Sequence, residues 1–147
     1  MAPSEKACSN ASAPIDIANV ENLDMCNAKC SLSCQYANAD LNIINRTKFL
    51  LLTEINTPTT SGEVMFNQKN YSIGEVRLYS PSLHTFNGKN ADMELIIIHN
   101  QVIGKTPQTT LPQLLICIPV SGDGTKKTTA SKALENIITN ASKKAPH

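Results

Sequence analysis

Asn87-Gly88 lies between two strand-sized segments and is the sequence feature that most constrains the fold. This dipeptide favours the type I′ turn, which joins neighbouring antiparallel strands because its twist matches theirs. The flanking segments, 83–86 and 92–99, have strand length and carry apolar and aromatic side chains. The sequence therefore predicts a hairpin here and an antiparallel sheet built around it.

Most other apolar segments are also of strand length. Residues 40–52 hold two apolar stretches split by Asn45-Arg46-Thr47-Lys48, which predicts a strand, a turn and a second strand. Further strands are predicted at 64–66, 71–79 and 113–120. Residues 57–62 are rich in turn-forming residues and are predicted to form a loop.

One helix is predicted, near the C-terminus. Within residues 129–143 apolar side chains recur at three- and four-residue spacing, as on the buried face of an amphipathic helix. The predicted fold class is mainly β (α+β), an antiparallel sheet with one C-terminal amphipathic helix. Residues 1–12 are expected to form a polar N-terminal arm, and residues 13–147 a single domain.

Composition narrows the functional classes. The chain has 147 residues, 17% of them charged, and a formal net charge of +1, as expected for one globular domain. This charge gives no reason to expect nucleic acid as a partner. No apolar run is long enough to cross a bilayer, and the first residues lack the apolar segment of a secretory signal. An intracellular location is therefore expected.

Three of the five cysteines, Cys26, Cys30 and Cys34, form a C-x3-C-x3-C run. Structural zinc sites usually combine C-x2-C pairs with a second pair or with histidines, and none follows this run. We therefore expect no metal here. The spacing permits a disulfide but does not require one, so a disulfide and free thiols both remain open.

Several motifs, taken in order, resemble the N-terminal portion of an α-carbonic anhydrase. The densest match runs from Tyr71 to His99 and is flanked by further matching motifs on both sides. The matching segments are Ala13-Pro14-Ile15-Asp16-Ile17, Pro81-Ser82-Leu83-His84-Thr85, Asn87-Gly88-Lys89, Met93-Glu94-Leu95-Ile96, Leu114–Val120 and the helix at 130–140. The resemblance implies a partial α-carbonic-anhydrase-like sheet whose C-terminal half is absent.

The resemblance places the zinc ligands of that family at Arg77, Tyr79 and Ile96. In the family three histidines hold Zn²⁺, which lowers the pKa of its bound water to about 7. A guanidinium is always protonated, and an isoleucine side chain has no donor atom. The family's glutamate before the His-Thr pair is Leu83 here. The expectation is therefore no catalytic residue, no metal and no cofactor, in a chain that is not an enzyme.

Two residues that support the zinc ligands in the family, His84 and Glu94, are retained. We expect them to form a structural hydrogen bond between two segments of the sheet. Alternation along the strand places Glu75, Arg77 and Tyr79 on one face, so the Arg77 guanidinium is expected to fill the former metal position and to pair with an acidic neighbour. His99 lies on the opposite side of its strand from Glu94 and is expected to be structural.

These expectations favour a non-catalytic structural or binding module within a larger assembly, such as a minor capsid protein of a large DNA virus. Its location would then be a virion or an intracellular assembly, with a protein partner covering the open sheet edge. One alternative is a glycan- or receptor-binding attachment module, but the only lysine pairs are Lys126-Lys127 and Lys143-Lys144. A less favoured alternative is a zinc-dependent carbonate dehydratase.

Overall fold

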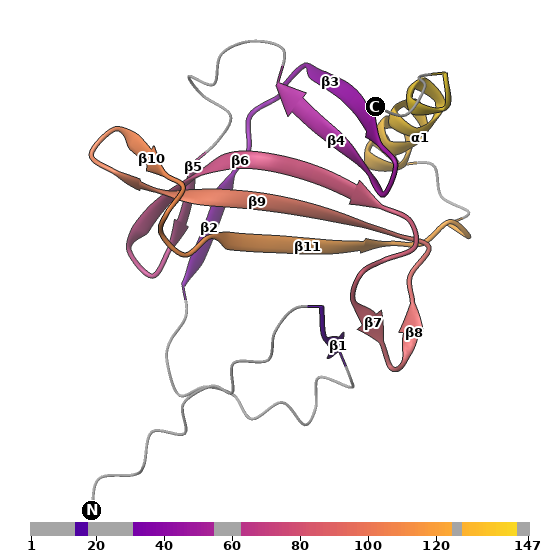
Figure 1. Cartoon of the computed structure of the whole chain (residues 1–147), viewed down its shortest axis with the longest axis horizontal. Coiled ribbons are helices and arrows are strands. Elements are labelled where there is room, and N and C mark those ends of the chain that lie inside the picture. The colour runs from indigo at the N-terminus through magenta and orange to yellow at the C-terminus, as the bar shows by residue number, and fades with distance from the viewer. Residues whose placement is uncertain (1–13, 18–30, 55–62, 125–127, 144–147) are drawn as a thin grey trace, which may run out of the picture.

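The computed structural model describes residues 14–17, 31–54, 63–124 and 128–143 (Figure 1). The predicted arm at 1–12, the predicted loop at 57–62, Cys26, Cys30 and the Lys126-Lys127 pair lie outside these ranges. The described elements are β1 (Asp16–Ile17), β2 (Leu32–Gln35), β3 (Leu41–Arg46), β4 (Phe49–Glu54), β5 (Glu63–Phe66), β6 (Lys69–Tyr79), β7 (Thr85–Phe86), β8 (Lys89–Asn90), β9 (Met93–Ile103), β10 (Thr106–Gln108), β11 (Leu114–Val120) and α1 (Thr129–Ser142).

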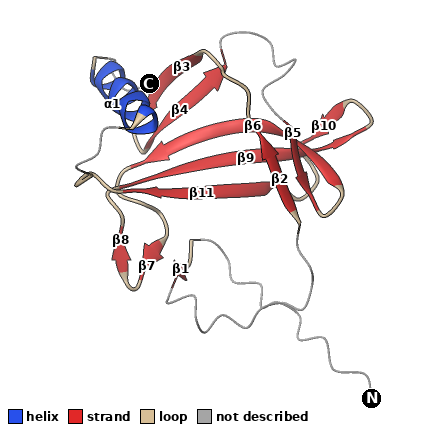
Figure 2. Cartoon of the chain, turned by 180° about the vertical axis from the view of Figure 1, so that it is seen from behind, coloured by secondary structure: helices blue, strands red, loops and turns tan. Residues whose placement is uncertain are grey.

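Two long antiparallel strands, β6 and β9, form the centre of an eight-stranded sheet. β6 also pairs with β4 and with β5; β4 in turn pairs with β3, and β5 with β2. β9 also pairs with β11 and with β10. All pairings within this sheet are antiparallel. The predicted mainly β fold with one C-terminal helix is therefore confirmed (Figure 2).

The hairpin predicted within 40–52 is formed by β3 and β4, with a turn after Arg46. The predicted helix is also present as α1. The Thr128 side chain caps its first turn by accepting a hydrogen bond from the Ser131 N–H, and Lys143 is its C-terminal cap. A side-chain oxygen at this position satisfies one of the N–H groups that a helix start leaves without a partner.

The Asn87-Gly88 turn is present, but the strands it joins differ from the prediction. Asn87 and Gly88 have φ values of 51° and 74°, as the turn requires. They join the two-residue strands β7 and β8, whereas β9 pairs with β6, β10 and β11. The reason is that the backbone N–H groups of Leu83 and His84 donate to the Glu94 carboxylate, so these residues do not extend the strand.

A β-bulge at Gly74 decides which side chains share a face of β6. Ile73 pairs with His99, and Glu75 pairs with Ile98, so one residue of β6 is extra at this point. Because successive side chains alternate, the extra residue puts Ile73 and Glu75 on opposite faces of the sheet.

Register defines the two faces of the sheet. One face, here called the helix face, carries Ile43, Leu50, Leu52, Val76, Leu78, Leu95, Ile97 and His99. The other, here called the site face, carries Phe49, Glu75, Arg77, Tyr79, Glu94, Ile96, Ile98 and Cys117.

The apolar core lies between the helix face and α1. Ile43, Leu52 and Ala141 are buried together, and Leu50, Val76, Leu95 and Ile137 pack against them. Both views place α1 beside β3 and β4, away from the hairpin of β7 and β8 (Figures 1 and 2). This packing leaves the site face without a helix over it in the described part of the chain. Among the described residues, no helix combines the length and the apolar character needed to span a bilayer.

Candidate functional site

Two rows of side chains cross the site face at one end of the central strands. Tyr79, Glu94 and Pro119 form one row, and Arg77, Ile96 and Cys117 form the next. Tyr79 and Arg77 come from β6, Glu94 and Ile96 from β9, and Pro119 and Cys117 from β11. The three positions that the resemblance assigns to zinc are therefore neighbours on one face of the sheet.

Glu94 is completely buried, and its carboxylate is held by three hydrogen bonds. Oε1 pairs with His84 Nδ1 at 2.7 Å, and Oε2 accepts from the backbone N–H groups of Leu83 at 2.9 Å and His84 at 3.1 Å. The hydrogen bond predicted between His84 and Glu94 is therefore present. Because an ionised carboxylate can only accept, Nδ1 carries the proton of this pair when Glu94 is charged.

The loop that presents His84 is fixed by a second buried group. Ser82 Oγ donates to the His84 carbonyl oxygen at 2.6 Å and accepts from the Ala91 N–H at 2.9 Å. Asn90 Nδ2 donates to the Ser82 carbonyl oxygen at 2.7 Å. His84 is thus held through both its backbone and its ring, which restricts where its remaining ring nitrogen can lie.

Cys117 brings a thiol to the His84–Glu94 pair. One nitrogen of His84, one carboxylate oxygen of Glu94 and Cys117 Sγ all lie within 4.8 Å of one another. Burial, and secondarily the nearby Glu94 carboxylate, raise the pKa of the Cys117 thiol. Among the described residues, this is the only cluster of histidine, cysteine and acidic side chains close enough to hold a metal ion.

Sequence reasoning did not single out Cys117. The signal that could have found it is the pairing of the apolar segment 114–120 with 93–99, which places Cys117 opposite Ile96. The sequence predicts both segments as strands, but their register depends on the tertiary structure. Cys34, which belongs to the C-x3-C-x3-C run, is an exposed free thiol on β2.

Arg77 pairs with an acidic neighbour, as expected, and that neighbour is Glu75. Arg77 Nε donates to Glu75 Oε2 at 2.7 Å, and the guanidinium carbon lies 4.9 Å from the centre of the Phe49 ring. Arg77 Nη1 also donates to the Tyr79 hydroxyl at 3.5 Å, and the hydrogen bonds to Tyr79 and Glu75 raise the pKa of Arg77. Of the three positions assigned to zinc, only Tyr79 offers a possible donor atom, so these residues do not fit a three-histidine zinc centre.

His99 lies on the helix face and is also completely buried. Its Nδ1 donates to the Leu114 carbonyl oxygen at 3.1 Å, and its Nε2 accepts from the Tyr36 hydroxyl at 3.0 Å. Burial, and secondarily Cys34, raise the pKa of Tyr36 to about 12, so this hydroxyl keeps its proton. Burial lowers the pKa of His99. Both ring nitrogens are occupied, as expected of a structural histidine.

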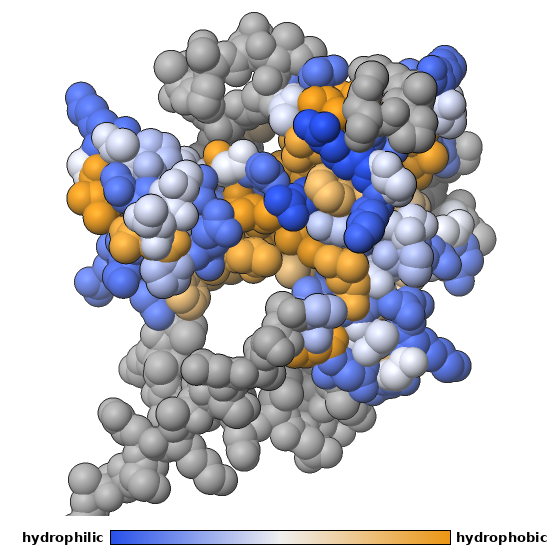
Figure 3. Space-filling model, viewed as in Figure 1, coloured by the Kyte–Doolittle hydropathy of each residue, from blue (hydrophilic) through white to orange (hydrophobic). Residues whose placement is uncertain are grey.

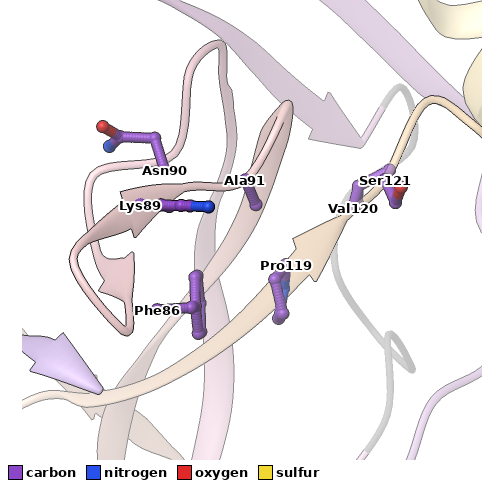
Figure 4. Close-up of a pocket in the computed structure, with 7 residues that line it drawn as sticks. All are labelled: Phe86, Lys89, Asn90, Ala91, Pro119, Val120 and Ser121. Atoms are coloured by element: carbon purple, nitrogen blue, oxygen red, sulfur yellow. The ribbon is translucent and has the colours of Figure 1, made fainter. Parts of the chain in front are cut away.

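A shallow pocket of about 310 Å³ lies between the β7–β8 hairpin and the end of β11 (Figure 4). Phe86, Ala91, Pro119 and Val120 give it mainly apolar walls, and Lys89 supplies its one charged side chain. These residues include no cluster of titratable groups. At this end of the sheet, the described side chains that could bind a metal ion together are therefore those of His84, Glu94 and Cys117.

No family model matches the chain. Alpha carbonic anhydrase 6 of Arabidopsis thaliana is 38% identical over 45 residues, which are 31% of this chain and 17% of that protein. The fungal α-carbonic anhydrase of Aspergillus oryzae has a TM-score of 0.63 and 18% identity, over 87% of this chain and 49% of its own. Dioscorin complexed with ascorbate has a TM-score of 0.63 and 18% identity, over 92% of this chain and 51% of its own.

These similarities show an α-carbonic-anhydrase-like fold. The chain spans about half the length of the two solved structures that it matches. At this level of identity the likeness concerns the fold, and function has to be argued from the site.

Proposed function

We propose that this chain with an α-carbonic-anhydrase-like fold is a non-catalytic structural or binding module of a larger assembly, such as a minor capsid protein of a large DNA virus. The observation that carries the proposal is the identity of the side chains at Arg77, Tyr79 and Ile96. They lie together on the site face, where the resemblance places three imidazoles. A carbonic anhydrase needs a metal-bound hydroxide, and this set of side chains cannot hold the metal in that way.

The charge arrangement supports the same proposal. A guanidinium occupies one of the former ligand positions, where it has no lone pair to donate to a metal ion, and Glu75 compensates its charge. Phe49 packs against Arg77 and, with ring centres 5.2 Å apart, against Tyr79. Arg77 and Tyr79 are thus engaged in ion pairing and aromatic packing with Glu75 and Phe49.

The edge strand β11 supports a role in binding another protein. Within the described residues β11 pairs with β9 on one side only, and Leu115 and Ile118 are 45% and 42% exposed. Apolar side chains gather across the middle of the view in Figure 3, over the long strands of the sheet. A strand with one open edge and exposed apolar side chains favours strand addition or packing by a partner. We propose that a protein partner covers this edge.

The catalytic part of the proposal is tested by CO₂ hydration with the purified full chain, before and after addition of Zn²⁺. An active α-carbonic anhydrase assayed in parallel provides the positive control. We expect no hydration above the buffer rate in either condition. Hydration that depends on zinc would overturn the proposal and support the alternative of a zinc-dependent carbonate dehydratase.

The binding part is tested by sedimentation velocity of the full chain over a range of concentrations. Ile118→Lys places a charge on the open edge, and Leu41→Lys, at a similarly exposed position on β3, is the matched control. We expect association of the wild-type chain that Ile118→Lys reduces and Leu41→Lys leaves unchanged. Equal effects of the two variants would show that β11 is not the contact edge.

A further inference from the structure

We propose that His84, Glu94 and Cys117 form a binding site for a borderline-soft divalent cation such as Zn²⁺, apart from the positions of Arg77, Tyr79 and Ile96. The site combines one nitrogen, one oxygen and one sulfur donor, a set that suits zinc better than magnesium or calcium. It goes beyond the proposed function, because a cation here would be a structural element of a module that carries out no turnover.

The distances place the donors close to a zinc geometry. Their three atoms lie within 4.8 Å of one another. Zinc bonds of about 2.0–2.3 Å in a tetrahedron bring ligand atoms to roughly 3.3–3.8 Å from one another. Closure therefore requires His84 Nδ1 and Glu94 Oε1, now 2.7 Å apart, to separate by roughly 0.6–1 Å, and Cys117 Sγ to move inward by at most about 1.5 Å. Small side-chain rotations can supply both movements.

Three separate elements hold the donors, so the site is largely formed without a cation. His84 lies on the loop fixed by Ser82, Glu94 on β9 and Cys117 on β11. The side chains of His84 and Glu94 are only 10% and 0% exposed, whereas Cys117 is half-buried at the edge strand. A cation could thus enter from the side of β11 and lose most of its water on binding.

Proton positions are compatible with this set of ligands. Nε2 of His84 has no hydrogen-bond partner within the described part of the chain, while Nδ1 pairs with Glu94. When a cation replaces the proton shared by Nδ1 and Oε1, that proton can move to Nε2, and the Cys117 thiol releases its proton to solvent. The filled site then contains one carboxylate, one thiolate and one divalent cation, so its net charge is zero.

The charged groups nearby do not oppose this occupancy. Arg77 is in the same row as Cys117, but its guanidinium is paired with Glu75 and directed toward Tyr79 and Phe49. Tyr79 is opposite Glu94 in the register and adds a neutral hydroxyl to the surroundings. The fourth position of a tetrahedral site would be left to water.

Cobalt titration of the full chain tests the proposal, because Co²⁺ substitutes for Zn²⁺ and reports thiolate ligation by its charge-transfer absorption. The reduced, metal-free protein should carry Cys8, Cys26, Cys30 and Cys34 all replaced by serine, which leaves Cys117 as the one thiol. We expect one Co²⁺ per chain with thiolate absorption. Adding Cys117→Ser should remove that absorption and weaken binding by about 100-fold or more, since even residues that only support a ligand contribute 10–100-fold.

His84→Gln provides a second variant. We expect it to weaken Co²⁺ binding by a similar factor and to shift the wavelength of the thiolate-to-cobalt absorption. Far-UV circular dichroism checks that each variant is folded; if His84→Gln unfolds, the Cys117→Ser comparison alone decides. The proposal is wrong if the four-serine protein shows no thiolate absorption with Co²⁺, or if the absorption survives Cys117→Ser. Metal binding without CO₂ hydration would support both this site and the proposed lack of catalysis, whereas hydration would overturn only the latter.

Discussion

Two buried histidines in the described part of the chain, His99 within the sheet and His84 on the loop that packs against its opposite face, have contrasting surroundings. His99 on the helix face uses both ring nitrogens, one toward Leu114 and one toward Tyr36. His84 on the site face uses one nitrogen toward the buried Glu94 carboxylate and leaves the other without a partner in the described part of the chain. The His99 side chain is completely buried and the His84 side chain is 10% exposed, and only His84 keeps a free position on its ring.

This difference separates a histidine that links strands from one that can take part in chemistry. A ring with two filled nitrogens cannot bind a cation without breaking a buried hydrogen bond. A ring with one free nitrogen, beside a carboxylate and a thiol, can rearrange its proton to do so. The difference between the two histidines therefore arises from their neighbours: Glu94 and Cys117 lie beside His84, whereas Tyr36 occupies the second nitrogen of His99.

Glu94→Ala should have the largest effect. It removes the acceptor of three hydrogen bonds, including two from backbone N–H groups of Leu83 and His84. Buried donors without partners should lower the free energy of unfolding by about 3 kcal/mol or more. Urea denaturation measures the change. Glu75→Ala is the matched control and should cost at most about 1 kcal/mol, because the Glu75 side chain is 42% exposed. Equal losses in the two variants would contradict the anchoring role of Glu94.

Tyr36→Phe tests the other histidine. It removes the hydroxyl that donates to His99 Nε2 and leaves a buried acceptor without a partner. The expected loss is about 1–2 kcal/mol in the free energy of unfolding. Tyr79→Phe, which removes only the 3.5 Å contact with Arg77, should change stability by less than about 0.5 kcal/mol. A loss for Tyr79→Phe as large as that for Tyr36→Phe would count against a structural role for the Tyr36 hydroxyl.

Stability should also depend on the protonation of His99. Burial lowers its pKa in the folded chain below the ordinary value of 6.5. Well above pH 6.5 the ring is neutral in both states; as the pH falls toward and below 6.5, the unfolded chain binds the proton first and stability declines. This one group can add a slope of at most about 1.4 kcal/mol per pH unit. Urea denaturation between pH 8 and pH 5 should show an excess slope that His99→Gln removes. An unchanged slope in this variant would assign the dependence to other groups.

Arg77→Met should have a smaller effect than Glu94→Ala or Tyr36→Phe. The pair with Glu75 is partly exposed, with side-chain exposures of 33% and 42%, so its loss should cost less than about 1 kcal/mol. The methionine keeps apolar contact with Phe49 and offers no hydrogen bond. A loss of several kcal/mol, measured by urea denaturation, would mean that Arg77 holds the site face together in the way that Glu94 does.

Much of the secondary structure could be predicted from the sequence because its signals are local. The split apolar stretch at 40–52 became the β3–β4 hairpin, and the periodic residues of 129–143 became α1. The Asn87-Gly88 turn was found, but its strands were assigned wrongly. The backbone of Leu83 and His84 bonds to a glutamate side chain instead of a strand, and no local pattern signals such a contact.

The candidate site was predicted in part. The His84–Glu94 hydrogen bond was expected from the resemblance, and the pairing of Arg77 with an acidic neighbour from the chemistry of its side chain. Cys117 was missed because its position depends on the register between β9 and β11. The bulge at Gly74 was also missed, although the alternation of apolar residues shifts by one position between Ile73 and Val76.

The sequence by itself determined most of the described strands, the C-terminal helix and the side chains at Arg77, Tyr79 and Ile96, because each depends on residue type and short-range spacing. Tertiary structure decided which histidine has a free nitrogen and which thiol lies beside it. Both results depend on strand register and on side chains that folding brings together from distant parts of the sequence. The local conformational preferences of the residues do not encode such contacts.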